Sequence, residues 1–169
     1  MYGYAPTATT FNRWQVYAPN LPEQLNTLAT LDFGNGYWIN ITDTTTLYLK
    51  GAGPTPNLMT TAGMDPPATY YGVVEASSSF TPRAGLVVTA KVNGQLCGQG
   101  QTFNVSGQIM YRVIVLADSD LPGCGTEGRT VALQVVGQGI VTVVIWSNTQ
   151  VGYAPLKALA QLFLPLVRR

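Results

Sequence analysis

Apolar and polar residues alternate along short segments between residues 69 and 149, and glycine, proline and Asn-Gly pairs separate these segments. In residues 86–92, every second side chain is apolar, while Thr89 and Lys91 fall on the opposite side. A period of two is typical of β-strands that bury one face. Asn93-Gly94 follows directly and predicts a two-residue hairpin. The pattern therefore predicts a strand that pairs with the residues after this turn.

The same reasoning predicts further strands in this part of the chain. They are expected at residues 70–75, 95–98, 109–115, 131–136 and 140–146. Residues 109–115 are almost continuously apolar, which indicates a central strand covered on both faces. Val136-Gly137-Gln138-Gly139 marks a second hairpin. Six or seven strands of this length hide their apolar faces best in two packed layers, so we predict an all-β sandwich.

The first 68 residues carry a weaker strand pattern. Residues 2–10 read as an irregular or extended lead-in, and short strands are expected at 14–17, 37–41 and 45–49. Proline and glycine are frequent from residue 50 to 68, as in interdomain linkers. We divide the chain into a partial N-terminal β module (1–53), a Pro/Gly-rich linker (54–68), a β-sandwich (69–152) and an apolar C-terminal tail (153–169).

The low content of charged residues makes some classes of partner improbable on physical grounds, nucleic acids in particular. Only 10% of the 169 residues are charged and the net charge is +1, whereas an ordinary soluble domain carries about 25% charged residues. Because no basic surplus is available to neutralise phosphates, we expect no nucleic-acid partner. No apolar run reaches the about 18 residues that a membrane span requires, so we predict no transmembrane segment.

The chain contains no histidine. This removes the usual general base near neutral pH, the Ser-His and Cys-His nucleophile pairs, and the commonest transition-metal ligand. Catalysis would have to rely on carboxylates, lysine or tyrosine. We therefore predict a protein that is not an enzyme, and we expect no cofactor.

Cys97 and Cys124 are the only cysteines. A disulfide, a reactive thiol and a metal pair are the alternatives for them. Two thiols without histidine make a poor zinc set, since structural zinc normally takes four ligands. The disulfide is the favoured interpretation, and it places the protein in an oxidising compartment outside the cytoplasm.

Three aromatic residues are candidates for a flat platform that stacks on sugar rings: Tyr37, Trp38 and Trp146. The alternative for Tyr37 and Trp38 is simple strand alternation, with one ring in the core and its neighbour half exposed. Strand aromatics mostly serve packing, which favours this alternative.

An acidic loop offers a calcium candidate through Asp118, Asp120 and Glu127. It matches an EF-hand loop at positions one and three, with Gly123 at position six, but Pro122 and Arg129 stand where ligands belong. A solvated turn between strands is the favoured interpretation, so we expect no bound metal.

The C-terminal tail carries apolar residues that fit two patterns. Its candidate strand-exchange residues are Leu162, Phe163, Leu164, Leu166 and Val167. The spacing of Leu162, Leu164 and Leu166 fits a strand, whereas Leu156, Leu159 and Leu162 fit a helical face. An exposed apolar tail is an aggregation hazard, so we expect it to dock. Docking in its own sandwich and docking in the open edge of a neighbouring subunit both remain open.

Two stretches resemble exported bacterial modules. The first has the pattern W-x-x-Y … L-x-x-L … G-x-G-Y-W-I … T … T-T-L, carried by Trp14, Tyr17, Leu28, Leu31, Gly34, Gly36, Tyr37, Trp38, Ile39, Thr42, Thr45, Thr46 and Leu47. We expect the N-terminal half of that module to be missing. The resemblance therefore implies an incomplete sheet whose unpaired edge accepts a strand from another chain.

The second resemblance spans about eighty residues. Its frame comprises Pro67 to Val74, Gly85, Val88 to Ala90, Asn93-Gly94, Cys97-Gly98, Tyr111 to Val115, Gly123 to Val131 and Trp146 to Thr149. The general plan resembles the transthyretin-like or carboxypeptidase-regulatory-like sandwiches of secreted enzymes and surface proteins. It implies an Ig-like or transthyretin-like β-sandwich, with a smaller N-terminal β piece, that acts as a spacer, stalk or attachment domain.

The expected function is a structural or adhesive module of a bacterial extracellular or cell-surface assembly. Its partners would be other copies of itself, neighbouring surface proteins or glycans. Polymerisation into a fibre by strand exchange is one form of this hypothesis. The alternative is a carbohydrate-binding accessory module of a secreted enzyme.

Overall fold

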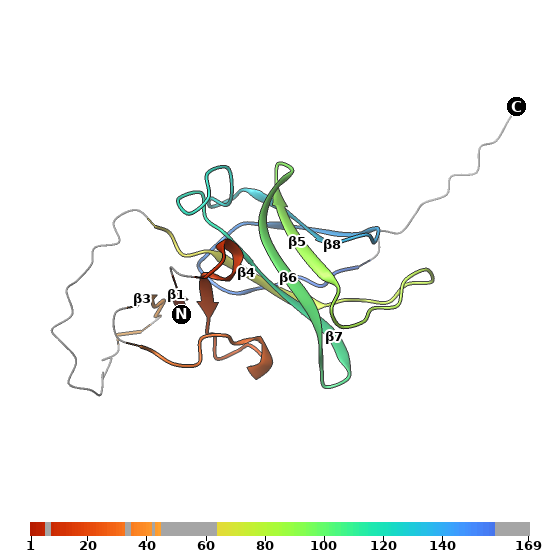
Figure 1. Ribbon diagram of the computed structural model, residues 1–169, viewed down its shortest axis with the longest axis horizontal. Helices are drawn as coiled ribbons and strands as arrows, with labels where there is room; N and C mark the ends of the chain where they lie inside the picture. The colour runs from red at the N-terminus through yellow and green to blue at the C-terminus, as the bar shows by residue number, and fades with distance from the viewer. Residues whose placement is uncertain (6–7, 33–34, 42, 45–63, 158–169) are drawn as a thin grey trace, which may run out of the picture.

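The computed structural model describes residues 1–5, 8–32, 35–41, 43–44 and 64–157 (Figure 1). The regular structure in these ranges is ten β-strands and two short 3-10 turns, η1 (Thr10–Asn12) and η2 (Glu23–Leu25). The strands form two sheets, one of seven strands and one of three. The all-β fold predicted from the sequence is confirmed.

The larger sheet contains seven strands that run antiparallel except at one end. They are β4 (Ala68–Val73), β5 (Val87–Val92), β6 (Gln95–Val105), β7 (Gln108–Val115), β8 (Thr130–Val135), β9 (Ile140–Ile145) and β10 (Gly152–Tyr153). The order across the sheet is β10-β4-β7-β6-β5-β8-β9, and the short β10 pairs with β4 in parallel. The strands predicted in this region are all present.

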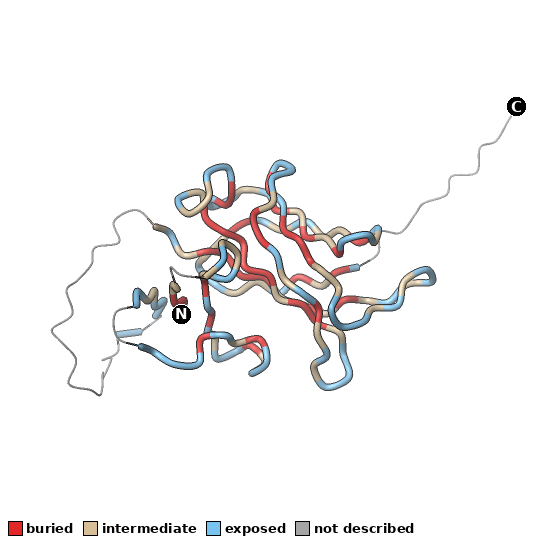
Figure 2. The backbone as a smooth tube through the Cα atoms, in the orientation of Figure 1, coloured by how far each residue is buried: buried red, intermediate tan, exposed pale blue. Residues whose placement is uncertain are grey.

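The two ends of this sheet lie against each other. The Tyr70 hydroxyl on β4 donates to the carbonyl oxygen of Ile145 on β9 at 2.7 Å. The Thr142 hydroxyl on β9 donates to the carbonyl oxygen of Pro155, just after β10, at 3.0 Å. The sheet therefore folds over a core in a sandwich-like arrangement, and Figure 2 shows the buried stretches along its strands.

The predicted alternation is reflected in the burial of β5. Val88, Ala90 and Val92 are fully buried, whereas Lys91 is exposed. The chain then turns through Asn93 and Gly94, both with positive φ, as the Asn-Gly signal predicted. The alternating burial along β5 and the Asn93-Gly94 turn therefore indicate the same register for this hairpin.

The smaller sheet has the order β2-β1-β3. Its strands are β1 (Tyr2–Tyr4), β2 (Trp14–Val16) and β3 (Gly36–Trp38). The sequence predicted β2 and β3 but treated the central strand β1 as an irregular or extended lead-in. The predicted strand over 45–49 lies outside the described residues.

The two sheets share one hydrophobic core. Tyr2, Trp14 and Val16 of the small sheet belong to the same buried cluster as the inner side chains of the large sheet. At the other end of the chain, Tyr153 is in β10 and Leu156 is fully buried beside β4. The first residues of the segment expected to be a tail therefore complete the larger sheet.

A disulfide joins Cys97 to Cys124, as predicted, with the sulfur atoms 2.09 Å apart and the Cα atoms 5.4 Å apart. Cys97 stands at a shift in the pairing of β5 and β6, where Ala90 lies opposite Gly98 but Lys91 lies opposite Leu96. A bulge of this kind re-aims a side chain. Both cysteines are fully buried, so the link clamps the loop before β8 onto the sheet.

We predict that replacing both cysteines by serine lowers the free energy of unfolding by about 3 to 4 kcal/mol, because the unfolded chain regains the freedom of a loop of this length. Urea denaturation of the C97S/C124S variant against the oxidised protein measures the difference. Never-reduced protein should show no titratable thiol. Two reactive thiols per chain would contradict the link.

Candidate functional site

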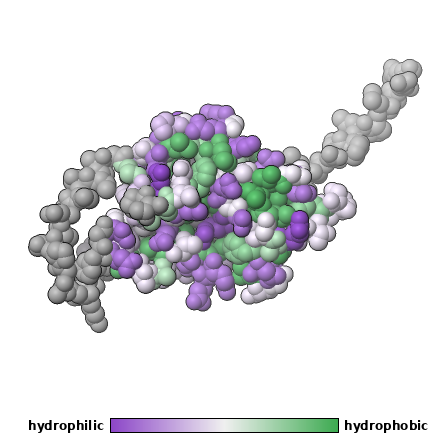
Figure 3. Space-filling view, in the orientation of Figure 1, coloured by the Kyte–Doolittle hydropathy of each residue, from purple (hydrophilic) through white to green (hydrophobic). Residues whose placement is uncertain are grey.

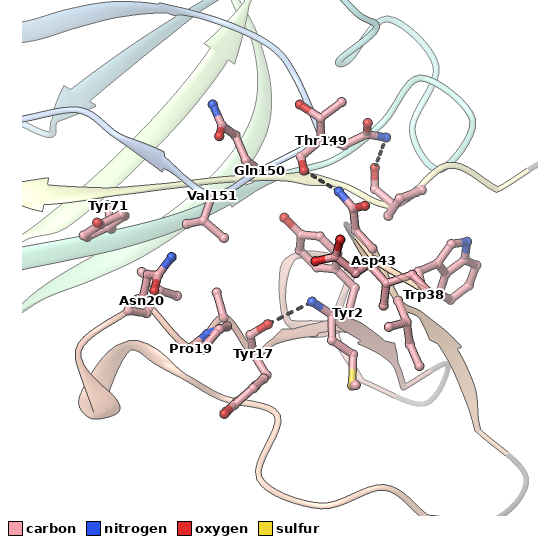
Figure 4. Close-up of a pocket in the computed structure, with 18 residues that line it drawn as sticks. Tyr2, Tyr17, Pro19, Asn20, Trp38, Asp43, Tyr71, Thr149, Gln150 and Val151 are labelled. Atoms are coloured by element: carbon pink, nitrogen blue, oxygen red, sulfur yellow. Dashed lines mark hydrogen bonds between the residues drawn. The ribbon is translucent and has the colours of Figure 1, made fainter. Parts of the chain in front are cut away.

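A groove of about 900 Å³ lies between the small sheet and the segment that joins β9 to β10 (Figure 4). Its volume is typical of a pocket that holds a small ligand. The lining residues come from β1, β3, the segments after β2 and β3, β4, and the β9–β10 connection. They are Met1, Tyr2, Tyr17, Ala18, Pro19, Asn20, Leu21, Trp38, Ile39, Asn40, Ile41, Asp43, Pro66, Tyr71, Asn148, Thr149, Gln150 and Val151.

The groove exists because the small sheet is held in one orientation on the large sheet. The Trp14 side chain is buried, and its indole N–H donates to Asp120 at 2.9 Å across a sequence separation of 106 residues. Arg13 lies 3.7 Å from the same carboxylate, whose side chain is only 3% exposed. The Tyr2 hydroxyl donates to the Thr69 hydroxyl at 3.1 Å. These polar contacts add to the shared hydrophobic core and fix the orientation of the small sheet on the large one.

Aromatic rings continue this interface towards the groove. The Trp14 ring packs edge-on against Tyr4 at 5.0 Å and lies 4.8 Å from the ring of Trp38. Trp38 in turn is one of the lining residues. The floor of the groove therefore rests on the same cluster that joins the two sheets.

Two asparagine side chains fix the rim. The Asn40 amide donates to the carbonyl oxygen of Thr149 at 2.6 Å, which links the small sheet to the β9–β10 connection. The Asn148 amide donates to the carbonyl oxygen of Pro66 at 3.0 Å. A primary amide has two N–H donors and a carbonyl acceptor. Each side chain therefore has hydrogen-bonding capacity beyond the bond that positions it.

The lining carries little charge. Among the described lining residues, Asp43 has the one side-chain carboxyl group, and neither lysine nor arginine is present. Met1 contributes its ammonium group, which donates to the carbonyl oxygen of Tyr17 at 2.8 Å. Burial raises the pKa of Tyr2, although its hydrogen bond to Thr69 acts in the opposite direction. The Tyr2 phenol is consequently neutral across the physiological range, and the groove offers aromatic faces, amides and hydroxyls.

The three aromatic residues predicted to form a platform, Tyr37, Trp38 and Trp146, do not share one surface in the fold. Tyr37 and Trp38 are neighbours on β3, so their side chains leave opposite faces of the strand, and Trp38 alone lines the groove. Trp146 is 3% exposed, and its indole N–H donates to the carbonyl oxygen of Val115 at 3.2 Å. Trp146 is therefore a core residue and presents no face to a ligand.

The acidic loop is built as a turn. Asp118 accepts a hydrogen bond from the Gly123 amide at 3.0 Å and pairs with Arg129 at 3.1 Å, and these two contacts lower its pKa. Asp120 is the acceptor for Trp14, and Glu127 is exposed. Within the described ranges, no group of three or more acidic or cysteine side chains is arranged for a metal ion. Asp118 therefore serves the turn, and Asp120 serves the sheet interface.

A second hollow, of about 690 Å³, lies between η1–β2 and the strands β6 and β7. The Arg112 side chain on β7 lines it and donates to the carbonyl oxygen of Leu25 at 2.6 Å. Burial lowers the pKa of Arg112. This arginine joins η2 to the large sheet and thereby supports the placement of the small sheet.

Strand β9 presents an apolar outer surface. Val143 is 62% exposed and Ile145 is 56% exposed, whereas Ile140 is buried. β9 is the last strand in the order of the large sheet and pairs with β8 alone in the described part of the chain. Figure 3 shows hydrophobic residues gathered in patches between hydrophilic ones on one face of the molecule.

The predicted strand-exchange residues, from Leu162 to Val167, lie outside the described residues. No helix in the described ranges is long and apolar enough to cross a membrane.

The groove residues Tyr71, Asn20 and Gln150 were not identified from the sequence. The polar run Ser147-Asn148-Thr149-Gln150 after a strand was the available signal, since binding residues concentrate on such connections.

Comparisons with protein-family models, with curated proteins and with solved structures find no match for this chain. The two resemblances to exported bacterial modules therefore stay predictions. The properties of the chain have to be argued from its own residues.

We predict that Asp120→Ala lowers the free energy of unfolding by about 1 to 3 kcal/mol, because the buried Trp14 indole loses its acceptor. Asp120→Asn is the matched control, since it keeps an oxygen acceptor while removing the charge, and it should cost less. Urea denaturation followed by circular dichroism measures both variants. Equal stability of the wild type and the alanine variant would contradict this assignment.

Proposed function

We propose that this chain is a non-enzymatic structural or adhesive module of a bacterial extracellular or cell-surface assembly, and that it associates with other copies through an open strand edge. The observation that carries the proposal is β9, an end strand whose outward side chains Val143 and Ile145 are apolar and more than half exposed. Soluble proteins usually protect such edges with charges, proline or a covering segment. Two side-chain hydrogen bonds, from Tyr70 to the carbonyl oxygen of Ile145 and from Thr142 to the carbonyl oxygen of Pro155, contact β9. Its apolar row of Val143 and Ile145 stays exposed beside them and is suited to strand addition.

The sequence supplies a segment suited to that edge. Residues 158–169 follow Lys157, and Leu162, Leu164 and Leu166 alternate in them with a period of two. A strand with this pattern lays one apolar row against the row on β9 while its backbone pairs with the edge. Pro165 cannot donate to a ladder, which suits a strand that pairs on one side only.

The buried disulfide supports an exported location. Structural disulfides form and persist in oxidising compartments and are rare in the cytoplasm. Cys97 and Cys124 are both fully buried, which is the environment of a structural link. A role outside the cell follows from this chemistry as part of the proposal.

The chemistry of the groove supports a role without catalysis. Glycoside hydrolysis usually takes a pair of carboxyl groups, and the lining of the groove contributes one, Asp43. The whole chain has no histidine to act as a general base. Binding and assembly are therefore the functions that the described surfaces fit best.

We expect the full chain to form oligomers in multiples of 18.1 kDa, measured by size-exclusion chromatography with light scattering. Truncation after Lys157 and the variant Val143→Lys should each give monomers, because the first removes the donor segment and the second places a charge on the acceptor edge.

Val136→Lys is the matched control for the edge variant. Val136 is 50% exposed but lies in the β8–β9 turn rather than on β9, so its replacement should leave the oligomer intact. A full chain that stays monomeric at every concentration would refute strand exchange, and docking of the tail in its own subunit would give that result. An oligomer that survives both the truncation and Val143→Lys would refute it as well.

A further inference from the structure

The groove between the small sheet and the β9–β10 connection is built from other residues than the exposed apolar row of β9. Figure 4 shows Pro19 and Asn20 on one side of it, with Gln150 and Val151 on the other. The interface between the two sheets holds the side that carries Pro19 and Asn20. The hydrogen bonds of Asn40 to Thr149 and of Asn148 to Pro66 hold the other side. A pre-formed hollow with fixed walls binds a ligand without a large ordering cost.

The side chains around the groove combine flat apolar surfaces with neutral polar groups. Tyr71 is half-buried, and its ring is held edge-on by Tyr153 at 5.4 Å. The ring of Tyr17 is 44% exposed and points away from Tyr71 in Figure 4. Asn20 is an exposed amide that points towards Val151, whereas the exposed Gln150 side chain points away from Asn20 (Figure 4). Tyrosine supplies a large contact area at low entropic cost, and amides both donate and accept hydrogen bonds.

This composition discriminates between ligand classes. A phosphate or sulfate group requires arginine, lysine or a cluster of backbone N–H groups. The described lining contains no basic side chain, and the ammonium group of Met1 already donates to the carbonyl oxygen of Tyr17 at 2.8 Å. A purely apolar ligand would leave the amides buried without partners, which costs free energy. A sugar ring has an apolar face of C–H groups and a rim of hydroxyls, so it matches both features together.

We propose that the groove binds an uncharged oligosaccharide, with Tyr71 as the stacking face and with Asn20 as a hydrogen-bonding partner of the ring hydroxyls. Trp38 supports the floor from β3, where its ring packs against Trp14. This inference is independent of strand exchange at β9. A protein that binds glycans as a monomer would satisfy the inference while refuting the proposed assembly.

The test is a screen of the full chain against an array of neutral glycans, followed by titration calorimetry with the best-bound oligosaccharide. Chitotetraose, cellotetraose and mannotetraose are included as soluble probes. We expect saturable binding that Tyr71→Ala weakens at least about tenfold, because truncation of an aromatic anchor is among the costliest changes at a binding site. Asn20→Ala should weaken binding several-fold.

Tyr37→Ala is the matched control, because it removes an aromatic residue of β3 from the side that does not line the groove. It should bind as the wild type does, and thermal melting of each variant confirms that the fold is intact. The inference is overturned if no neutral glycan binds, or if Tyr71→Ala binds unchanged. Capture of an extended peptide from a peptide library, lost in Tyr71→Ala, would assign the groove to a different ligand and would overturn it too.

Discussion

The burial of Trp14 is the contact on which the arrangement of the molecule depends. Its ring lies in the core shared by the two sheets, and its indole N–H needs an acceptor there because an unpaired buried donor is costly. Asp120, in the loop after β7, supplies that acceptor. The side chain therefore specifies both that the small sheet packs on the large one and in which orientation. The groove and its fixed walls are consequences of that orientation.

The Cys97–Cys124 link restrains the loop that supplies the acceptor for Trp14. It holds the loop that contains Asp118 and Asp120 against β6, and a bulge at Cys97 makes the link geometrically available. The Arg129 guanidinium pairs with Asp118 and bonds the carbonyl oxygen of Cys124, so the loop is also fixed by polar contacts. The acceptor for Trp14 is thus held in a loop with several restraints, which lowers the entropic cost of presenting it.

Local pattern and turn chemistry were sufficient to predict six of the seven strands of the large sheet, because burial of one face enforces a period of two and Asn-Gly enforces the hairpin. The short β10 was not predicted, because it falls where the expected tail begins. The disulfide followed from two cysteines in a chain without histidine. β1 was missed because Tyr2-Gly3-Tyr4 is too short to show a period, and its neighbours in the sheet are distant in sequence. Trp146 was misassigned because composition does not distinguish an aromatic residue in the core from one on the surface. The groove could not be predicted, since it depends on the docking of two sheets.

Native-state hydrogen exchange tests the shared core most directly. If Trp14 joins the sheets into one cooperative unit, the amides of β1 and β2 exchange with the same free energy of opening as those of β5 and β7, because they are exposed only by global unfolding. Exchange of β1 and β2 at a much lower free energy, while β5 and β7 stay protected, would show that the small sheet opens on its own and would contradict the account.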